Sequence, residues 1–145
     1  MQNAQTMING LLSFLSMNTL ASLEEKHGVC YRLSSDKTKM SLNYDQISAR
    51  DSDVMAQVSR GLILGTMDGT ELNVSEPLPN LKVLAFPFCR FFNYGQESAA
   101  PVDMDAKDTQ FLAKLDGTCI ILYYDLFKGE WFVATRSVSE ADVPL

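Results

Sequence analysis

The sequence predicts an α+β protein in which an N-terminal helix packs on antiparallel sheet. Three observations lead to this fold class. Apolar residues recur at helical spacing between residues 6 and 26, and short β-prone runs separated by turn residues follow. The chain has 145 residues, of which 46% are hydrophobic and 21% are charged, which is the balance of one globular domain.

The expected helix runs from Thr6 to about Lys26. Its apolar residues lie three or four positions apart, with Asn, Ser and Thr between them. Thr6 is the candidate N-cap, and Gly28 is the candidate stop signal. A break near Asn18 is also compatible with the sequence, because Ser22-Leu23-Glu24-Glu25 fits a capping box.

The rest of the chain is expected to form short strands joined by turns and loops. β-prone runs bounded by turn residues mark the strands. In chain order they are Val29–Leu33, Met40–Tyr44, Val58–Leu64, Glu71–Val74, the extended segment Leu81–Phe88, Gln110–Lys114, Thr118–Asp125 and Trp131–Arg136. The third and fourth are expected to form a hairpin, and the last three an antiparallel meander with its second turn at Leu126–Glu130. Gln46–Ala56 is expected to be a loop with at most a helical turn.

Charge and residue usage exclude several classes of site. The net charge of −6 does not suit a general nucleic-acid binder, because binding phosphates needs clustered Lys and Arg. Three cysteines without a Cys-x-x-Cys pair predict neither a disulfide framework nor a zinc site, and Cys119 is expected to be a small buried hydrophobe. His27 is the single histidine, which argues against a Ser-His-Asp triad, and it is expected in a surface loop. No signal peptide or membrane-spanning segment is recognised, so a cytoplasmic protein without a membrane partner is expected.

The stretch 111–124 carries the strongest chemical signal. An apolar run ends at Lys114, and Asp116-Gly117 then predicts a tight turn before a second β-prone run. Lys114 is therefore expected at the end of a strand, where rigid backbone would hold it toward a pocket. The turn at Asp68-Gly69-Thr70 serves as a control, because Thr66 stands there where the later turn has a lysine. The lysine, rather than the turn, makes this stretch distinctive.

A lysine in this setting can act as a nucleophile toward the α-phosphorus of ATP. Burial or neighbouring positive charge can lower the pKa of a lysine and leave a neutral amine available. Asp116 would hold the turn, Gly117 would let the backbone approach a nucleotide, and Leu115 would offer backbone groups and apolar contact to the base. The phosphates would need cations, supplied by arginines and a magnesium ion. The candidate arginines are Arg60, Arg90 and Arg136.

Four sequence blocks, in order, carry a family resemblance. They are Ser59-Arg60-Gly61-Leu62-Ile63, Arg90-Phe91-Phe92-Asn93-Tyr94-Gly95, Lys114-Leu115-Asp116-Gly117-Thr118 and Ala134-Thr135-Arg136-Ser137. From about Tyr31 to the C-terminus the chain resembles the ATP-dependent RNA ligases of the bacteriophage RNA ligase 1 type. The third block resembles nucleotidyltransferase motif I, which DNA ligases and capping enzymes share, whereas they lack the Phe-Phe-Asn block. The resemblance implies part of a nucleotidyltransferase domain of the ATP-grasp-like ligase kind.

The resemblance also implies a role for each matched residue. Lys114 would form a covalent adduct with AMP from ATP and Mg²⁺, and Arg60 would contact the nucleotide phosphates. Arg90 stands where the family often has lysine and would make a further phosphate contact. Phe92 would shape the ATP pocket, and Arg136 would take the place of a basic residue that serves the same site. The implied substrate is RNA with a 5′-phosphate and a 3′-hydroxyl.

The resemblance covers the beginning of the family's domain. The family's later motifs supply a carboxylate for the ribose, an acidic residue for the metal and a lysine pair for the α-phosphate, and the chain ends nine residues after Arg136. Residues 1–145 are therefore expected to be one C-terminally incomplete domain, with weak or no activity unless a second polypeptide supplies the missing motifs. Two alternatives stay open: a non-catalytic remnant or nucleotide-binding or interaction module, and a DNA ligase or capping-type nucleotidyltransferase.

Overall fold

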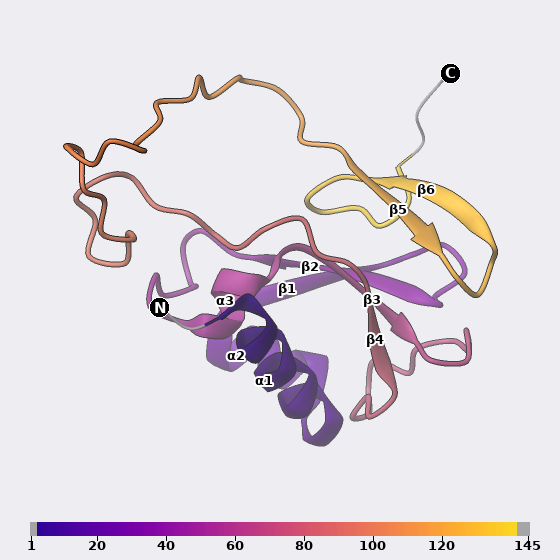
Figure 1. Cartoon of the computed structure of the whole chain (residues 1–145). Coiled ribbons are helices and arrows are strands. Elements are labelled where there is room, and N and C mark those ends of the chain that lie inside the picture. The colour runs from indigo at the N-terminus through magenta and orange to yellow at the C-terminus, as the bar shows by residue number, and fades with distance from the viewer. Residues whose placement is uncertain (1–2, 142–145) are drawn as a thin grey trace.

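A computed structural model describes residues 3–141, which form helices and two antiparallel sheets (Figure 1). The helices are α1 (Ala4–Met17), α2 (Leu20–His27) and α3 (Val54–Val58). The strands are β1 (Val29–Leu33), β2 (Lys39–Tyr44), β3 (Arg60–Thr66), β4 (Leu81–Ala85), β5 (Ile121–Asp125) and β6 (Glu130–Ala134). One sheet has the order β1-β2-β3-β4, and β5 and β6 form a separate hairpin. The mixture of helices and antiparallel sheets confirms the predicted α+β class.

The four-stranded sheet separates two layers, with the helices under one face and the β5–β6 hairpin over the other (Figure 1). The alternation of side chains along β3 explains this arrangement. Leu62 and Leu64 are fully buried in the core that the helices cover. Ile63, between them, is fully buried in a second, smaller core with Ile121 and Tyr123 of the hairpin. β3 therefore has an apolar residue at every position from 62 to 64 because both of its faces are covered.

The N-terminal helix starts earlier than predicted. Asn3 caps α1, because its side chain accepts a hydrogen bond from the Gln5 N–H at 3.0 Å, and Thr6 lies inside the helix. α1 ends at Met17 with Asn18 as its C-cap, and Asn18 is where the sequence is compatible with a break. Neither α1 nor any other helix in residues 3–141 combines the length and the apolar character needed to cross a membrane.

A second helix follows the break. Thr19, rather than Ser22, is its N-cap and accepts a hydrogen bond from the Ser22 N–H at 3.3 Å. Gly28 ends α2 in the left-handed conformation, as predicted. His27 is the last residue of α2 and not a loop residue, and its Nδ1 lies 2.8 Å from the carboxylate of Asp53. This contact holds the half-buried imidazole against the loop before α3.

The strands β1 and β2 agree with the prediction, but β3 begins two residues later than expected. Val58 closes the short helix α3 instead of opening a strand. The Asp53 side chain starts this helix by accepting hydrogen bonds from the backbone N–H groups of Met55 and Ala56, at 2.9 and 3.2 Å. The predicted helical turn in this region is therefore a short helix capped by Asp53, and it ends directly before β3.

The predicted hairpin between β3 and Glu71–Val74 is wrong. β3 pairs with β4, which lies in the segment predicted to be extended, and Thr66 stands opposite Leu81. The turn after β3 is instead held to the β1–β2 connection, because the Leu72 N–H donates to the Lys37 carbonyl at 2.9 Å. The Leu72 side chain is buried in the helix-side core. This burial draws Glu71–Val74 away from the edge of β3 and leaves that edge to β4.

The last two strands of the predicted meander form with shorter bounds. Their turn is Leu126–Gly129, so Glu130 opens β6 instead of closing the turn, and Arg136 lies beyond the end of β6. Gln110–Lys114 is not a strand in the described chain, and residues 118–120 precede β5 without pairing. Cys119 is exposed, which corrects the prediction that it is buried. A strand ribbon is stable when one face is covered. The sheet covers β5 and β6, whereas every residue from 111 to 120 is exposed.

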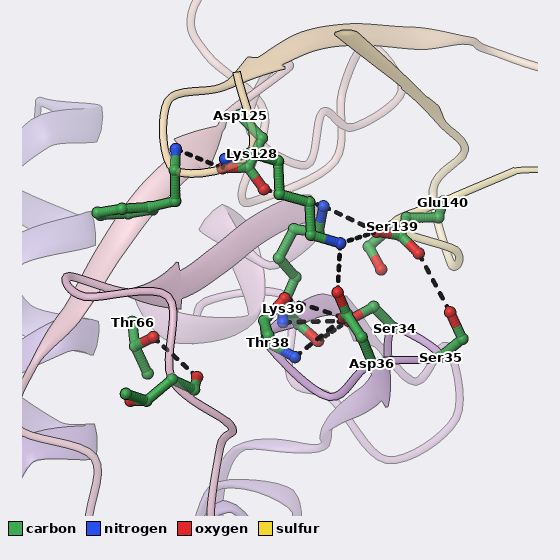
Figure 2. Close-up of polar contacts among 12 residues, drawn as sticks. Ser34, Ser35, Asp36, Thr38, Lys39, Thr66, Asp125, Lys128, Ser139 and Glu140 are labelled. Atoms are coloured by element: carbon green, nitrogen blue, oxygen red, sulfur yellow. Dashed lines mark hydrogen bonds and ion pairs between the residues drawn. The ribbon is translucent and has the colours of Figure 1, made fainter. Parts of the chain in front are cut away.

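A buried lysine fastens the hairpin to the sheet (Figure 2). The side chain of Lys39, at the start of β2, is 1% exposed. Its Nζ lies 3.0 Å from Asp125 Oδ2 at the end of β5 and 2.8 Å from Glu140 Oε1 beyond β6. The ammonium group also lies 3.5 Å from the ring centroid of Phe132 in β6. Every one of these contacts crosses from the sheet to the hairpin or to the segment that follows it.

A second lysine extends this network (Figure 2). Lys128, in the β5–β6 turn, donates to Asp36 of the β1–β2 connection and, at 3.4 Å, to Glu140. Burial alone would raise the pKa of Asp125, but hydrogen bonds from Lys39 and from two backbone N–H groups of the turn hold this pKa below its ordinary value. Asp125 is therefore ionised near neutral pH and pairs with the Lys39 ammonium.

Replacing Lys39 by Ala should lower the free energy of unfolding by about 3–5 kcal/mol, because Asp125 would be left buried without its partner charge. Urea denaturation followed by the fluorescence of Trp131, the single tryptophan, measures the change. Lys26→Ala, on the exposed side of α2, is the matched control and should stay within about 0.5 kcal/mol. Equal stability of the two variants would contradict a fastening role for Lys39.

Candidate functional site

Two of the predicted arginines meet at the end of β2. The guanidinium carbons of Arg90 and Arg136 lie 4.3 and 4.6 Å from the ring centroid of Tyr44. The Arg136 Nε also donates a hydrogen bond to Asn43 Oδ1 at 2.7 Å. Arg60, the first residue of β3, is the cross-strand partner of Asn43. Three sequence blocks that lie far apart in the chain therefore place arginines at this end of the sheet: Arg90 and Arg136 against Tyr44, and Arg60 across from Asn43.

Aromatic rings of one segment accompany these arginines. The guanidinium carbon of Arg60 lies 4.5 Å from the ring centroid of Phe88 and 5.0 Å from that of Phe91. The guanidinium carbon of Arg90 lies 5.0 Å from the ring centroid of Phe92. Stacking on an aromatic face orients a planar guanidinium while its N–H groups stay available at the edge.

Arg90 is the most firmly held of the three arginines. Its Nη2 lies 2.6 Å from Asp51 Oδ1, and its backbone N–H donates to the Gln57 carbonyl at 2.7 Å. Its Nη1 is buried and has no hydrogen-bond partner among the residues that the structure describes. Buried donors in folded proteins are almost always paired. An anionic oxygen, such as that of a phosphate, would satisfy this donor.

Gly61 allows the hairpin to come close to β3 beside the arginines. It has a φ of 83°, and a Cβ built there would lie 3.1 Å from Ile121 Cδ1 and 3.2 Å from Arg136 Cα. Glycine is needed here both for the backbone conformation and for the close approach. In the Arg60-Gly61 pair, the arginine supplies a cation, and the glycine leaves the space that lets the backbone of Arg136 lie close to β3.

An open pocket of about 530 Å³ lies at the Arg136 end of this cluster. It is lined by Cys30, the segment Asn43–Ile47 and Arg136. Burial, together with the neighbouring Glu24 carboxylate, raises the pKa of the Cys30 thiol, so this cysteine is no thiolate nucleophile near neutral pH. Within residues 3–141, no group of three or more His, Cys, Asp or Glu side chains is arranged to hold a metal ion.

The motif I residues lie apart from the arginines. Lys114 is on the long connection between β4 and β5, its side chain is 76% exposed, and its Nζ lies 3.6 Å from Asp116 Oδ1. Leu115 and Gly117 are exposed as well. Arg60, Arg90, Phe92 and Arg136 are thus brought together, whereas Lys114, Leu115, Asp116 and Gly117 are not brought to them in this arrangement.

Three residues of the cluster escaped the sequence prediction. Asn43 and Tyr44 orient the arginines, and Asp51 pairs with Arg90. No spacing in the sequence distinguishes an Asn-Tyr pair at a strand end or an Asp in a polar loop. Their role comes from the antiparallel pairing of β2 with β3, which places the end of β2 beside Arg60.

Comparison with known proteins gives one partial likeness. No family model matches the chain, and no solved structure matches it. The chain is similar in part to an RNA ligase. This relative, from Rhodothermus phage RM378, is 36% identical over 64 residues, covering 30% of this chain and 15% of the relative. The chain therefore spans about 15% of the length of this curated relative.

Replacing Gly61 by Ala should lower the free energy of unfolding by about 1–3 kcal/mol, because alanine is strained at this φ and its Cβ would press on Ile121 and Arg136. Gly10→Ala is the matched control. Gly10 lies within α1 with open space around it, so this change should stabilise the protein by about 0.5–1 kcal/mol. Thermal denaturation of both variants measures the difference. If Gly61→Ala is as stable as Gly10→Ala, the close approach of the hairpin to β3 is incorrect.

Proposed function

We propose that this chain is part of an ATP-dependent RNA ligase that joins a 5′-phosphate to a 3′-hydroxyl. The observation that carries the proposal is the convergence of Arg60, Arg90 and Arg136 at one end of the sheet. The partial likeness to a phage RNA ligase supports the same assignment. A cluster of guanidinium groups in a protein of net charge −6 favours a local phosphate site over a broad nucleic-acid surface.

In this proposal the arginines hold the phosphates of ATP. Arg90 offers the unpartnered Nη1, and Arg60 and Arg136 add charge from the two neighbouring layers. Phe92 lies beside Arg90 and supplies apolar surface to the nucleotide. Mg²⁺ would arrive on the ATP phosphates, as it commonly does in nucleotide sites, because the described residues offer no group of three carboxylate, cysteine or histidine ligands.

Lys114 is the proposed nucleophile. Its neutral Nζ would attack the α-phosphorus of ATP, forming an N–P bond while the bond to the bridging oxygen breaks and pyrophosphate leaves. The AMP group would then pass to the RNA 5′-phosphate, and the RNA 3′-hydroxyl would displace AMP. Asp116 and Gly117 would shape the turn beside the nucleotide, and Leu115 would contact the base. The remaining groups of such a site would come from the rest of a longer ligase or from a second polypeptide.

A second candidate function is a nucleotide-binding or interaction module without catalysis. The exposed position of Lys114 favours this alternative, because its side chain is 76% exposed and its ion-pair partner is Asp116 instead of a group of the arginine cluster. The two candidates share ATP binding at the arginines. They differ in whether Lys114 becomes labelled.

ATP binding should depend on the arginine cluster. Arg90→Ala and Arg136→Ala should each weaken ATP binding roughly 10–100-fold, because each removes charge-assisted hydrogen bonds to phosphate. Isothermal titration calorimetry with ATP and Mg²⁺ measures the affinities. Arg50→Ala, on the exposed loop before α3, is the matched control and should bind like the natural chain. An affinity that Arg136→Ala leaves unchanged would place the nucleotide elsewhere.

The covalent step is tested with ATP labelled at the α-phosphate. Any adduct that survives denaturation should lie on Lys114, and Lys114→Ala should abolish it while Lys107→Ala, exposed on the same connection, keeps it. The reaction is run with the chain alone and with a second polypeptide that carries the lysine pair and acidic groups of an RNA ligase. An adduct that persists in Lys114→Ala would refute the proposed nucleophile. Tight ATP binding without an adduct in either mixture would favour the non-catalytic module.

A further inference from the structure

The segment that carries Lys114 exposes apolar side chains that nothing covers. Phe111, Leu112 and Leu115 are 78%, 84% and 88% exposed. We call residues 110–118 the strap. An isolated exposed apolar residue is ordinary on a protein surface, but a run of them in a β-prone segment indicates a surface that is buried in another arrangement.

An apolar groove lies next to the strap. It has a volume of about 550 Å³ and runs between the segment Leu84–Phe88, at the end of β4, and the segment Cys119–Tyr124, with Trp131 on its rim. β5 pairs with β6 along one side, and its other edge has no strand partner in residues 3–141. No lysine or arginine lines the groove, so its chemistry suits an apolar strand and not a phosphate backbone.

The register of a closed strap follows from its turn. A turn with Asp116 and Gly117 as its two central residues places Lys114 opposite Cys119 and Leu112 opposite Ile121. Cross-strand partners share a face, and so do residues two positions apart. Ile121 is buried against β3, with its Cδ1 3.1 Å from where a Cβ on Gly61 would lie. Leu112 and Lys114 would therefore face β3.

The opposite face of the closed strap would continue an aromatic surface. Phe111 would stand opposite Leu122, which shares the outer face of the hairpin with Tyr124 and Trp131. The rings of Tyr124 and Trp131 already pack edge to face at 5.4 Å between centroids. Closure would thus bury Leu112 within the molecule and extend the outer aromatic surface by one ring.

We propose that the strap closes as a third strand on the free edge of β5, with Leu112 in the groove and Lys114 turned toward the Arg60-Gly61 end of β3. This inference rests on the proposed function for its purpose, since closure is the motion that brings the nucleophile to the arginine cluster. The geometry itself rests on the exposed apolar residues, the groove and the register.

Amide hydrogen exchange of the free chain tests the closure without any reaction. The strap amides should exchange at least about tenfold more slowly in the natural chain than in Leu112→Asp, because a carboxylate cannot enter the apolar groove. Met104→Asp adds the same charge to the same connection outside the strap and should keep the slow exchange. The amides of β3 report in every variant that the sheet is folded.

Strap amides that exchange equally fast in the natural chain and in Leu112→Asp would overturn the closure, and so would an equal loss of protection in Met104→Asp. The two proposals fail separately. Slow exchange in a chain that binds no ATP would leave the strap in place and overturn the proposed function. ATP binding at the arginines with a fast-exchanging strap would overturn the closure alone.

Discussion

The charge of Lys39 has to be neutralised inside the protein, and this requirement places the hairpin. The Lys39 side chain is only 1% exposed to solvent. Burying a charged ammonium group costs several kcal/mol of folding free energy unless the group is paired and hydrogen-bonded. Asp125 and Glu140 provide the pairing, and both reach Lys39 only when β5 and the segment after β6 lie over β2. The apolar contact of Ile63 with the hairpin stabilises the docking but does not fix the orientation of the hairpin, because hydrophobic attraction is non-directional. The ion pairs of Lys39 fix that orientation.

The position of the hairpin in turn assembles the arginine cluster. β2 carries Lys39 at its first residue and Asn43 and Tyr44 at its end, and the hairpin is held at both places. Arg136 reaches Tyr44 because it lies two residues after the end of β6, and because Gly61 leaves room for its backbone. The candidate site therefore depends on how the two sheets dock. A substitution of Lys39 should alter the position of Arg136 relative to Tyr44, because both depend on the placement of the hairpin.

Local patterns in the sequence predicted the parts of the fold that local physics decides. The helical spacing before Gly28, the strands β1 and β2 and the β5–β6 turn were all correct. The partner of β3 could not be predicted, because it depends on where the backbone and side chain of Leu72 find their contacts. No feature of the sequence distinguishes Lys39 from a surface lysine, because its burial results from the docking of the hairpin over β2.

In the candidate site, too, sequence patterns identified some residues, whereas others could be found only from tertiary contacts. A family resemblance identified Arg60, Arg90 and Arg136, whose roles stay predictions. The fold brings Arg90 and Arg136 to Tyr44 and places Arg60 across from the neighbouring Asn43. Asn43, Tyr44 and Asp51 were missed because their contacts are made across strands and loops. An Asp-Gly turn signal beside Lys114 did not place the segment in a strand in this structure, where residues 111–120 are exposed and none of them pairs with β5.

The central claim is that the arginine cluster is a phosphate site, and nuclear magnetic resonance of the arginine Nε–Hε groups tests it most directly. Titration with ATP and Mg²⁺ should shift the signals of Arg60, Arg90 and Arg136 together along one saturating curve. The exposed Arg32 and Arg50 should not follow that curve. Saturating shifts confined to Arg32 and Arg50, or no saturating shift at the three clustered arginines, would contradict the account.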